Sequence, residues 1–183
     1  MKTTKILTIL VLMFGLVGSA SAALVAHYQF EGNANDSTVN GLDGILLGGA
    51  GIIIDAERGN VLSLATDGDY VDCGYDTLFD ITDSITVAAW IKVDLFNRSY
   101  QAVVTKGNYT WKLTRSAQTN SMAFFCNFMG VGDMSASGTM NVNDGQWHHV
   151  AGVYDGSKID LYVDGVLDKS QLAWGIINTD TSR

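Results

Sequence analysis

The segment from Glu31 to Asp43, EGNANDSTVNGLD, holds the densest set of oxygen donors in the chain. Ca²⁺ takes about six to eight oxygen ligands from carboxylates, amides and backbone carbonyls. Acidic side chains gathered this closely repel one another unless they are spread apart or a cation is bound. The segment therefore predicts either a structural calcium site, which would order the loop, or an ordinary solvated turn loop. The side chains available as ligands are Glu31, Asn33, Asn35, Asp36, Asn40 and Asp43.

Carboxylates paired for glycoside hydrolysis are hard to find in this sequence. Such enzymes need two acids across the scissile bond, and on a strand this means alternate positions that share one face. Only Glu31 and Glu57 are glutamates, and most of the aspartates stand beside Gly or Asn in turns. The nucleophile motif G-x-S-x-G does not occur either. We therefore predict no catalytic residues, and an enzyme with an unrecognised Asp pair is the less favoured alternative.

The histidines do not predict a metal site. His148 and His149 are adjacent, so on a strand their side chains point to opposite faces and cannot bind one zinc ion together. His27 is the third histidine, and no Cys/His spacing supports a cluster. We expect one of the paired histidines to be packed and the other partly solvated.

Aromatic rings flanked by amides or charged groups are candidates for sugar contacts, because a ring offers apolar area at a small cost in entropy. Two such groups occur, and their predicted ligand-binding residues are Tyr100, Tyr109 and Trp111. The alternative for each ring is a place in the core. We assign Trp90 and Trp147 to the core, since both lie within strong strand patterns.

Two cysteines, Cys73 and Cys126, leave two readings open. Disulfides form in oxidising compartments, so an exported chain could join them. Two buried free thiols are the alternative, since both residues lie in strand-like runs whose separation the sequence does not give.

Residues 1–22 have the features of a secretory signal peptide. Lys2 and Lys5 form a basic start, an apolar core runs from Ile6 to Val17, and Ala20-Ser21-Ala22 is a small-residue cleavage site. We predict a secreted or cell-surface protein that begins at Ala23, with no membrane insertion after cleavage. Its net charge would be −10, against −8 for the whole chain. An acidic surface disfavours nucleic acid and suits neutral ligands, calcium or basic partners.

After residue 23 the chain shows short apolar runs broken by Gly, Asn and Asp, which is typical of an all-β protein. The segment Asp144–Leu167 predicts three strands joined by turns at Asp155-Gly156 and Asp164-Gly165. The expected strands are Leu24–Phe30, Ile45–Leu47, Ile52–Asp55, Val61–Leu64, Tyr70–Cys73, Ser84–Val93, Gln101–Lys106, Thr110–Arg115, Ser121–Phe128, Trp147–Tyr154 and Ile159–Val163, followed by a strand after Gly165. We predict one domain over residues 23–183.

Several phrases in this order resemble the laminin-G-like, concanavalin A-like lectin/glucanase family. They are Leu24–Glu31, Gly68–Val71, Val87–Ile91, Trp147–Ala151 and Tyr162–Gly165. The resemblance implies a two-sheet antiparallel jelly-roll sandwich. Members usually continue with further strands, so we expect this chain to be an incomplete domain.

The resemblance also implies a function and a ligand set for calcium. Family members of this kind hold a structural calcium on the early loop, which makes Asp36 the best side-chain ligand, Glu31 the next, and the backbone near Asn40 a further one. The family contains many sugar-binding and adhesion modules. We therefore predict an exported, non-catalytic module that binds carbohydrate, with a protein-binding adhesion or scaffold module as the alternative and a glycoside hydrolase as a less favoured reading.

Overall fold

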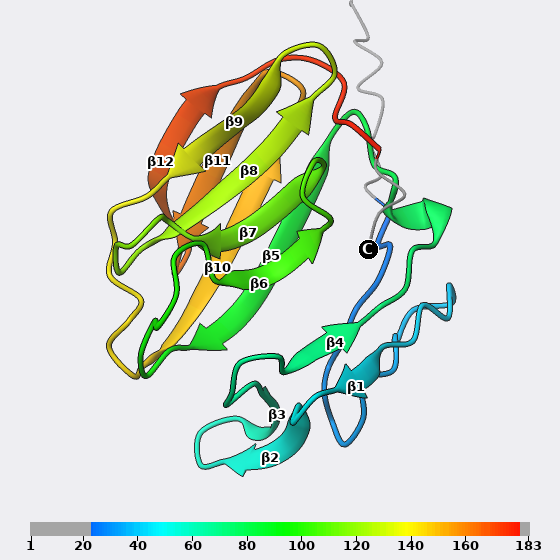
Figure 1. The fold of residues 1–183 in the computed structure, drawn as a ribbon, viewed down its shortest axis with the longest axis vertical. Coiled ribbons are helices and arrows are strands. Elements are labelled where there is room, and N and C mark those ends of the chain that lie inside the picture. Colours follow the sequence, from blue (N-terminus) through cyan, green and yellow to red (C-terminus); the bar gives the residue numbers. More distant parts are fainter. Residues whose placement is uncertain (1–22, 180–183) are drawn as a thin grey trace, which may run out of the picture.

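The computed structural model describes residues 23–179, so the predicted signal peptide at residues 1–22 lies outside the described residues. Short strands and a single 3-10 turn make up the regular structure of this part of the chain (Figure 1). The strands are β1 (Ile45–Leu47), β2 (Gly51–Asp55), β3 (Gly59–Ser63), β4 (Tyr70–Asp72), β5 (Ile85–Lys92), β6 (Ala102–Lys106), β7 (Trp111–Arg115), β8 (Met122–Phe128), β9 (Gly132–Ser137), β10 (Trp147–Tyr154), β11 (Lys158–Val163) and β12 (Val166–Leu172), and the turn η1 spans Thr77–Phe79.

Eight strands form two antiparallel sheets of four, packed face to face (Figure 1). One sheet has the order β12-β11-β10-β5 and the other the order β6-β7-β8-β9. Strand β8 contacts β10 and β11 across the interface, and β9 contacts β11 and β12. The predicted all-β, two-sheet antiparallel sandwich is confirmed. Fully buried side chains between the sheets include Leu113, Met122, Phe124, Phe128, Val150, Ile159 and Leu161.

The close approach of the two sheets depends on a glycine in β10. A Cβ atom placed on Gly152 would lie 2.1 Å from Cγ of Phe124, a fully buried ring of β8. Real Cβ atoms do not tolerate such a distance, so only glycine lets the Phe124 side chain pack this close to the opposing strand. This contact fixes how closely β8 and β10 pack.

The meander predicted from Asp144 to Leu167 is present as β10, β11 and β12. The β11–β12 turn has two central residues, Asp164 and Gly165, with φ of 51° and 78°. Positive φ at both positions is the geometry of a tight hairpin turn. Strand β12 runs on to Leu172, so this strand is longer than the pattern around Gly165 indicated.

The N-terminal part of the described chain forms two small sheets, β1 with β4 and β2 with β3, to one side of the sandwich near β5 and β6 (Figure 1). The predicted strand Leu24–Phe30 is wrong: only an isolated bridge joins Tyr28 to Asp36. Phe30 has a φ of 58°, and a residue in this conformation cannot continue an extended strand. The segment therefore crosses the surface as an irregular connection.

Strand β9 was not predicted from the sequence. Its residues, GDMSAS, include no apolar run, and only Ala136 is buried. It forms because its backbone pairs with β8 over six positions. Within residues 23–179 no helix has the length and apolar character needed to cross a membrane.

Candidate functional site

The Glu31–Asp43 loop is organised around the carboxylate of Asp36. This side chain is only 8% exposed. Its Oδ1 accepts hydrogen bonds from the backbone N–H groups of His27 and Thr38, both at 2.9 Å. Its Oδ2 accepts from the Thr38 hydroxyl at 2.6 Å and from the Leu42 N–H at 3.1 Å. Burial raises the pKa of Asp36, but these bonds outweigh it and lower the pKa to about 2.

The predicted calcium ligands also make bonds within the protein, and the calcium site itself stays a prediction. The bonds to His27, Thr38 and Leu42 occupy both oxygens of Asp36, the ligand expected to be the best one. Among residues 23–179 no group of three or more His, Cys, Asp or Glu side chains converges as a metal site would require. Glu31 accepts a bond from the Asn60 side chain, and the Asn40 side-chain amide donates to the Val25 carbonyl, a bond that does not involve the backbone oxygens predicted as ligands near Asn40.

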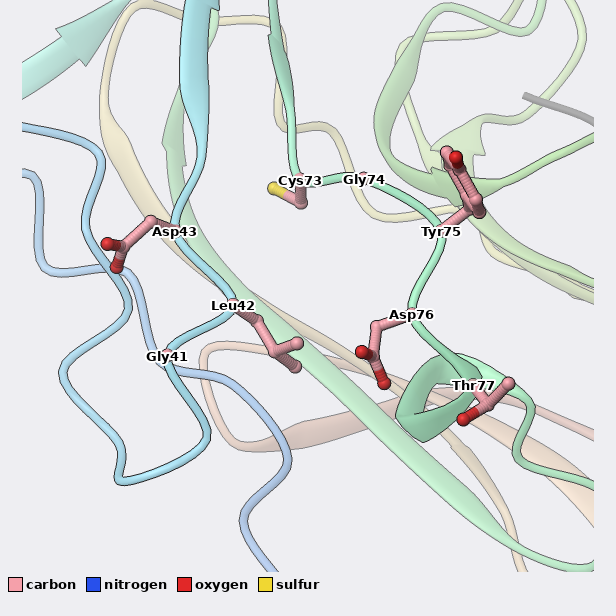
Figure 2. Close-up of a pocket in the computed structure, with 8 residues that line it drawn as sticks. All are labelled: Gly41, Leu42, Asp43, Cys73, Gly74, Tyr75, Asp76 and Thr77. Atoms are coloured by element: carbon pink, nitrogen blue, oxygen red, sulfur yellow. The ribbon is translucent and has the colours of Figure 1, made fainter.

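A shallow pocket of about 530 Å³ lies where this loop meets the segment after β4 (Figure 2). Its two carboxylates serve backbone groups: Asp43 accepts from the Asp36 N–H, and Asp76 accepts from the Leu78 N–H at the start of η1. The two acids of this pocket thus hold turns of the backbone.

Of the two alternatives left open for the cysteines, the structure has the free thiols. Cys73 follows β4 and lines the shallow pocket, as Figure 2 shows. Cys126 is fully buried in β8, where it belongs to the sandwich core. Burial raises the pKa of Cys126 to about 12, so this thiol stays protonated and acts as a small apolar side chain.

The three predicted ligand-binding aromatics differ in exposure. Trp111 is 7% exposed, and its indole N–H points to the Phe79 carbonyl at 3.4 Å, so its ring belongs to the core. Tyr100 is exposed and packs edge-on against Phe125 with 6.2 Å between ring centroids. Tyr109 is exposed in the turn between β6 and β7. Tyr100 and Tyr109 therefore keep accessible rings, and Trp111 does not.

The assignment of Trp90 and Trp147 to the core is wrong. Along β5 the residues that face the core alternate with exposed ones, and Trp90 falls on the outer face with half of its surface, 51%, exposed. The register pairs Trp90 with His149 and Lys92 with Trp147, so all four side chains share this face. A strand pattern places side chains on alternate faces but does not say which face will be covered.

Trp90 is the centre of a compact group on the outer face of the sheet, which we call the Trp90 cluster: Arg58, Trp90, Lys92, Trp147 and His149. The Arg58 guanidinium comes from the β2–β3 hairpin and lies 3.5 Å from the Trp90 ring centroid and 5.2 Å from that of Trp147. The His149 ring meets Trp90 edge-on at 5.3 Å. Cation–π contacts of this kind orient both the cation and the ring.

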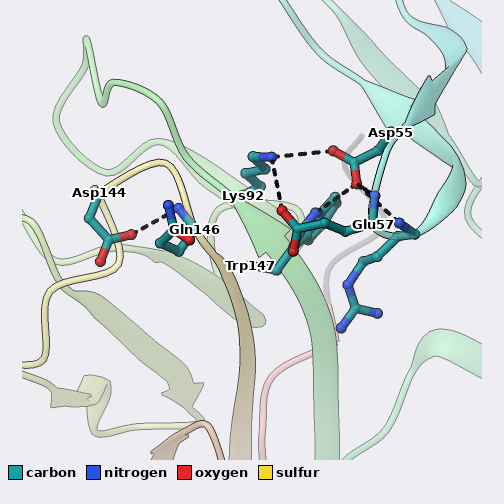
Figure 3. A network of polar contacts seen from close by, with 7 residues as sticks. Asp55, Glu57, Lys92, Asp144, Gln146 and Trp147 are labelled. Carbon is teal, nitrogen blue, oxygen red and sulfur yellow. Dashed lines mark hydrogen bonds and ion pairs between the residues drawn. The ribbon is translucent and has the colours of Figure 1, made fainter.

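A carboxylate from the same hairpin holds the cluster together (Figure 3). Asp55 accepts from the Trp147 indole N–H at 3.1 Å and from the Lys92 ammonium at 3.3 Å. The backbone N–H of Glu57, followed by Trp147 and Lys92, lowers the pKa of Asp55 to about 2 despite its burial. Lys92 also lies 3.9 Å from Glu57. These contacts anchor the β2–β3 hairpin over the end of the sheet.

The cluster faces a groove of about 3140 Å³ that runs between the N-terminal sheets and the β5 and β6 edges. Asp55, Arg58, Trp90, Trp147 and His149 all line it. Apolar ring surface, a guanidinium and a carboxylate therefore lie together beside this open space, and groups of these kinds can contact a sugar ring and its hydroxyls.

The paired histidines point to opposite faces, as predicted. His149 lies in the Trp90 cluster, whereas the His148 ring contacts Asp164 Oδ2 at 2.8 Å and Asp144 Oδ1 at 3.1 Å. Burial lowers the pKa of His148, but the two carboxylates outweigh burial and raise it. His148 thus joins the loop before β10 to the β11–β12 turn.

Comparison with protein families gives one match. The model of the family Laminin_G_3, described as the concanavalin A-like lectin/glucanases superfamily, matches residues 65–182, which is more than half of the chain. No curated protein sequence matches the chain significantly.

Solved structures share the fold at low sequence identity. The binding domain of Paraclostridial Mosquitocidal Protein 1 superposes with a TM-score of 0.68 at 13% identity, over 80% of this chain and 40% of that one. Domain 4 of AbnA, a GH43 extracellular arabinanase from Geobacillus stearothermophilus solved with arabinotriose, gives 0.65 at 18% identity, over 86% of this chain and 79% of that one. The present chain thus spans less than half of the first of these and about four fifths of the second, and both share its jelly-roll sandwich.

Proposed function

This chain belongs to the concanavalin A-like lectin/glucanases superfamily, and from that membership we propose that it is an extracellular, non-catalytic module that binds carbohydrate through the Trp90 cluster. One observation carries the proposal: a half-exposed indole on the sheet surface, flanked by Arg58 and His149. An indole offers apolar area to a sugar ring, and the neighbouring N–H groups can donate to its hydroxyls.

The absence of a catalytic role is part of the proposal. A glycosidase needs one free carboxyl to donate a proton and a second to act as nucleophile or base. Asp55, the acid that contacts the cluster, already accepts from Trp147 and Lys92. The structurally similar domains described above are a toxin's binding domain and an arabinanase domain solved with a saccharide, which supports binding. Extracellular placement follows from the predicted signal peptide.

The experiment is retention of the purified protein on polysaccharides, with arabinan, xylan, chitin, polygalacturonate and alginate as probes, combined with an assay for released reducing sugar. We expect retention on at least one polymer and no sugar release above a heat-treated sample. Failure to be retained on any of them would contradict carbohydrate binding, and sugar release would contradict the non-catalytic role.

Calcium remains a separate proposal, resting on the oxygen-rich Glu31–Asp43 loop, with Glu31, Asp36 and Asn40 as the proposed ligands. Binding there requires the loop to give up part of the bonding of Asp36 to Thr38 and Leu42. A ligand bound only to the folded state must raise its melting temperature. Equal melting temperatures in calcium and in chelator would end this proposal.

Tyr100 and Tyr109 are proposed as additional contacts. Tyr100 lies with Phe125 on the sheet that does not carry Trp90, and Lys112 lies 5.1 Å from the Phe125 ring centroid. Substituting Tyr100 by Ala would reduce retention only if a glycan reaches this second surface.

A protein-binding role is the second candidate, and the edge of β5 favours it. Among the described strands β5 pairs only with β10, so the other side of this eight-residue strand is unpaired. An open edge accepts an extended peptide through backbone hydrogen bonds. Protection of β5 amide hydrogens by a protein partner, with no retention on any polysaccharide, would favour this function.

A further inference from the structure

The Arg58 side chain has donors that the protein does not use. Within residues 23–179, its guanidinium makes cation–π contacts to Trp90 and Trp147 but has no hydrogen bond or ion pair to an acceptor. The backbone N–H of Arg58, not its side chain, donates a hydrogen bond to Asp55. The guanidinium therefore lies over the Trp90 ring and near the Trp147 ring, beside the groove, and no acceptor among the described residues takes its N–H groups.

The other cation of the cluster is differently placed. The Lys92 ammonium lies 3.3 Å from Asp55 and 3.9 Å from Glu57, so carboxylates of the protein already neutralise it. Arg58 is the cation left to a ligand. A stacked guanidinium presents a planar fork of donors, which matches the two oxygens of a carboxylate better than it matches single hydroxyl groups.

We propose that the Trp90 cluster recognises acidic glycans, with Arg58 binding the carboxylate of a uronic acid residue while Trp90 contacts the sugar ring. This inference rests on the proposed function, because it names the class of sugar that the same site takes. It assigns the two residues distinct roles: Trp90 provides affinity for any sugar ring, and Arg58 provides the preference for the acid.

The net negative charge of the chain opposes the binding of an acidic glycan, so the preference for acids must come from contacts within the site. With a net charge of −8, the protein as a whole repels a polyanion. At physiological salt the screening length is about 8 Å, so acids far from the groove weaken a local contact only a little. An acidic glycan that is retained must therefore be held by specific donors, and of the two basic side chains in the Trp90 cluster Arg58 is the one without a carboxylate partner among the described residues.

The test compares each acidic polymer with its own neutral form. Polygalacturonate, alginate and hyaluronate are offered to the protein beside carboxyl-reduced samples of the same polymers, in affinity electrophoresis. We expect at least one acidic polymer to bind roughly tenfold or more tightly than its reduced form, the ratio of a charged hydrogen bond gained. Arg58→Gln should bring that ratio close to one. Lys169→Gln, which removes the same charge from the exposed part of β12, should leave it unchanged.

The possible results distinguish three claims: carbohydrate binding, the preference for acidic polymers and the role of Arg58. Equal binding of acidic and reduced polymers, or binding of neutral ones alone, would overturn the acidic preference and leave carbohydrate binding standing. No binding of either form of any polymer would contradict both. An unchanged ratio in Arg58→Gln would overturn the role of Arg58, and Arg58→Lys, which keeps the charge without the planar fork, should give a ratio between those of the wild type and Arg58→Gln. Thermal unfolding of each variant shows whether the hairpin contact to Trp90, rather than ligand binding, has been lost.

Discussion

At the scale of single residues, the acids of this protein organise its backbone. Asp36 takes hydrogen bonds from three residues of the N-terminal region, His27 before the Glu31–Asp43 loop and Thr38 and Leu42 within it. Asp55 does the same for the β2–β3 turn and adds Trp147 from the sandwich. Hydrogen bonds from this many donors stabilise the charged form of a buried carboxylate. Removing the carboxylate leaves those donors without partners.

Asp36→Ala should destabilise the protein by about 2 kcal/mol or more, because backbone N–H groups would be left unsatisfied in a buried position. Urea unfolding of the two proteins measures the difference. Asp133→Ala, which removes a single exposed bond to Asn127, is the control and should change stability by less than about 0.5 kcal/mol. Equal effects of the two substitutions would show that Asp36 is not the organising residue.

The Asp36 contribution should also depend on pH. The pKa of Asp36 falls from 3.8 to about 2 on folding. A lowered pKa gives stability that is complete above the unfolded value and is lost as pH falls through the folded value. The stability difference between wild type and Asp36→Ala should therefore be constant above about pH 4 and shrink toward about pH 2, in unfolding curves recorded across this range.

His148 should give the opposite dependence. Its pKa is raised by Asp164 and Asp144, which outweigh burial. A raised pKa gives stability that is complete below the ordinary histidine value, about 6.5, and is lost as pH rises through the folded value. Comparing wild type with His148→Asn between about pH 5 and pH 8 should show the advantage of His148 decreasing as pH rises.

The control for this measurement is His27→Asn. The ring of His27 is exposed and contacts the Ser37 hydroxyl rather than a carboxylate. The ion pairs described for His148 would be contradicted if the stability difference between wild type and His148→Asn increased with pH. They would also be contradicted if this difference equalled the one between wild type and His27→Asn.

At the scale of elements, the packing of β8 on β10 gives the sharpest test. Gly152→Ala would force a Cβ atom against the Phe124 ring. We expect a loss of about 1–3 kcal/mol in unfolding free energy, because the buried ring cannot move without disturbing its neighbours. Gly51→Ala in β2, where the nearest atom to an added Cβ lies at 4.0 Å, is the matched control and should be close to neutral. Similar losses at both positions would show that the sheets do not pack as described.

Most strands could be predicted because apolar residues alternate with polar ones, or form short runs bounded by Gly, Asn and Asp, as is typical of strands. Strands β1 and β10 have the predicted bounds, and β5 differs by one residue at each end. β9 could not be predicted, since its pairing comes from β8 and its own residues are small and polar. The sequence favours a strand at Leu24–Phe30, but Phe30 takes a positive φ there.

The binding surface was harder to predict than the fold. Trp90 and Trp147 occupy strand positions that look the same whether the face is packed or open, and only the sheet's pairing decides between them. Arg58 could not be connected with them at all, because it lies in a hairpin about 30 residues away from β5 in the chain. The opposite error was made for Trp111. Its polar neighbours in the sequence suggested an exposed ring, but the ring is buried.

At the scale of the whole molecule, one side of the sandwich differs from the rest. The N-terminal sheets, the unpaired edge of β5 and the Trp90 cluster all border the same groove. The β2–β3 hairpin links these parts, since Asp55 and Arg58 reach across to Trp147 and Trp90. We propose that a carbohydrate binds at the part of the groove that carries the Trp90 cluster, and that Arg58 selects acidic sugars at the same place.

The measurement that tests this account most directly is calorimetric titration of wild type, Trp90→Ala and Trp174→Ala with a polysaccharide that retains the wild-type protein. Trp174 is also exposed but lies outside the Trp90 cluster, so it controls for the general loss of an indole. We predict that Trp90→Ala binds at least tenfold more weakly, a loss of about 1.4 kcal/mol or more, while Trp174→Ala binds as the wild type does. Unchanged affinity in a Trp90→Ala protein that melts like the wild type would contradict the claim that this surface binds the glycan.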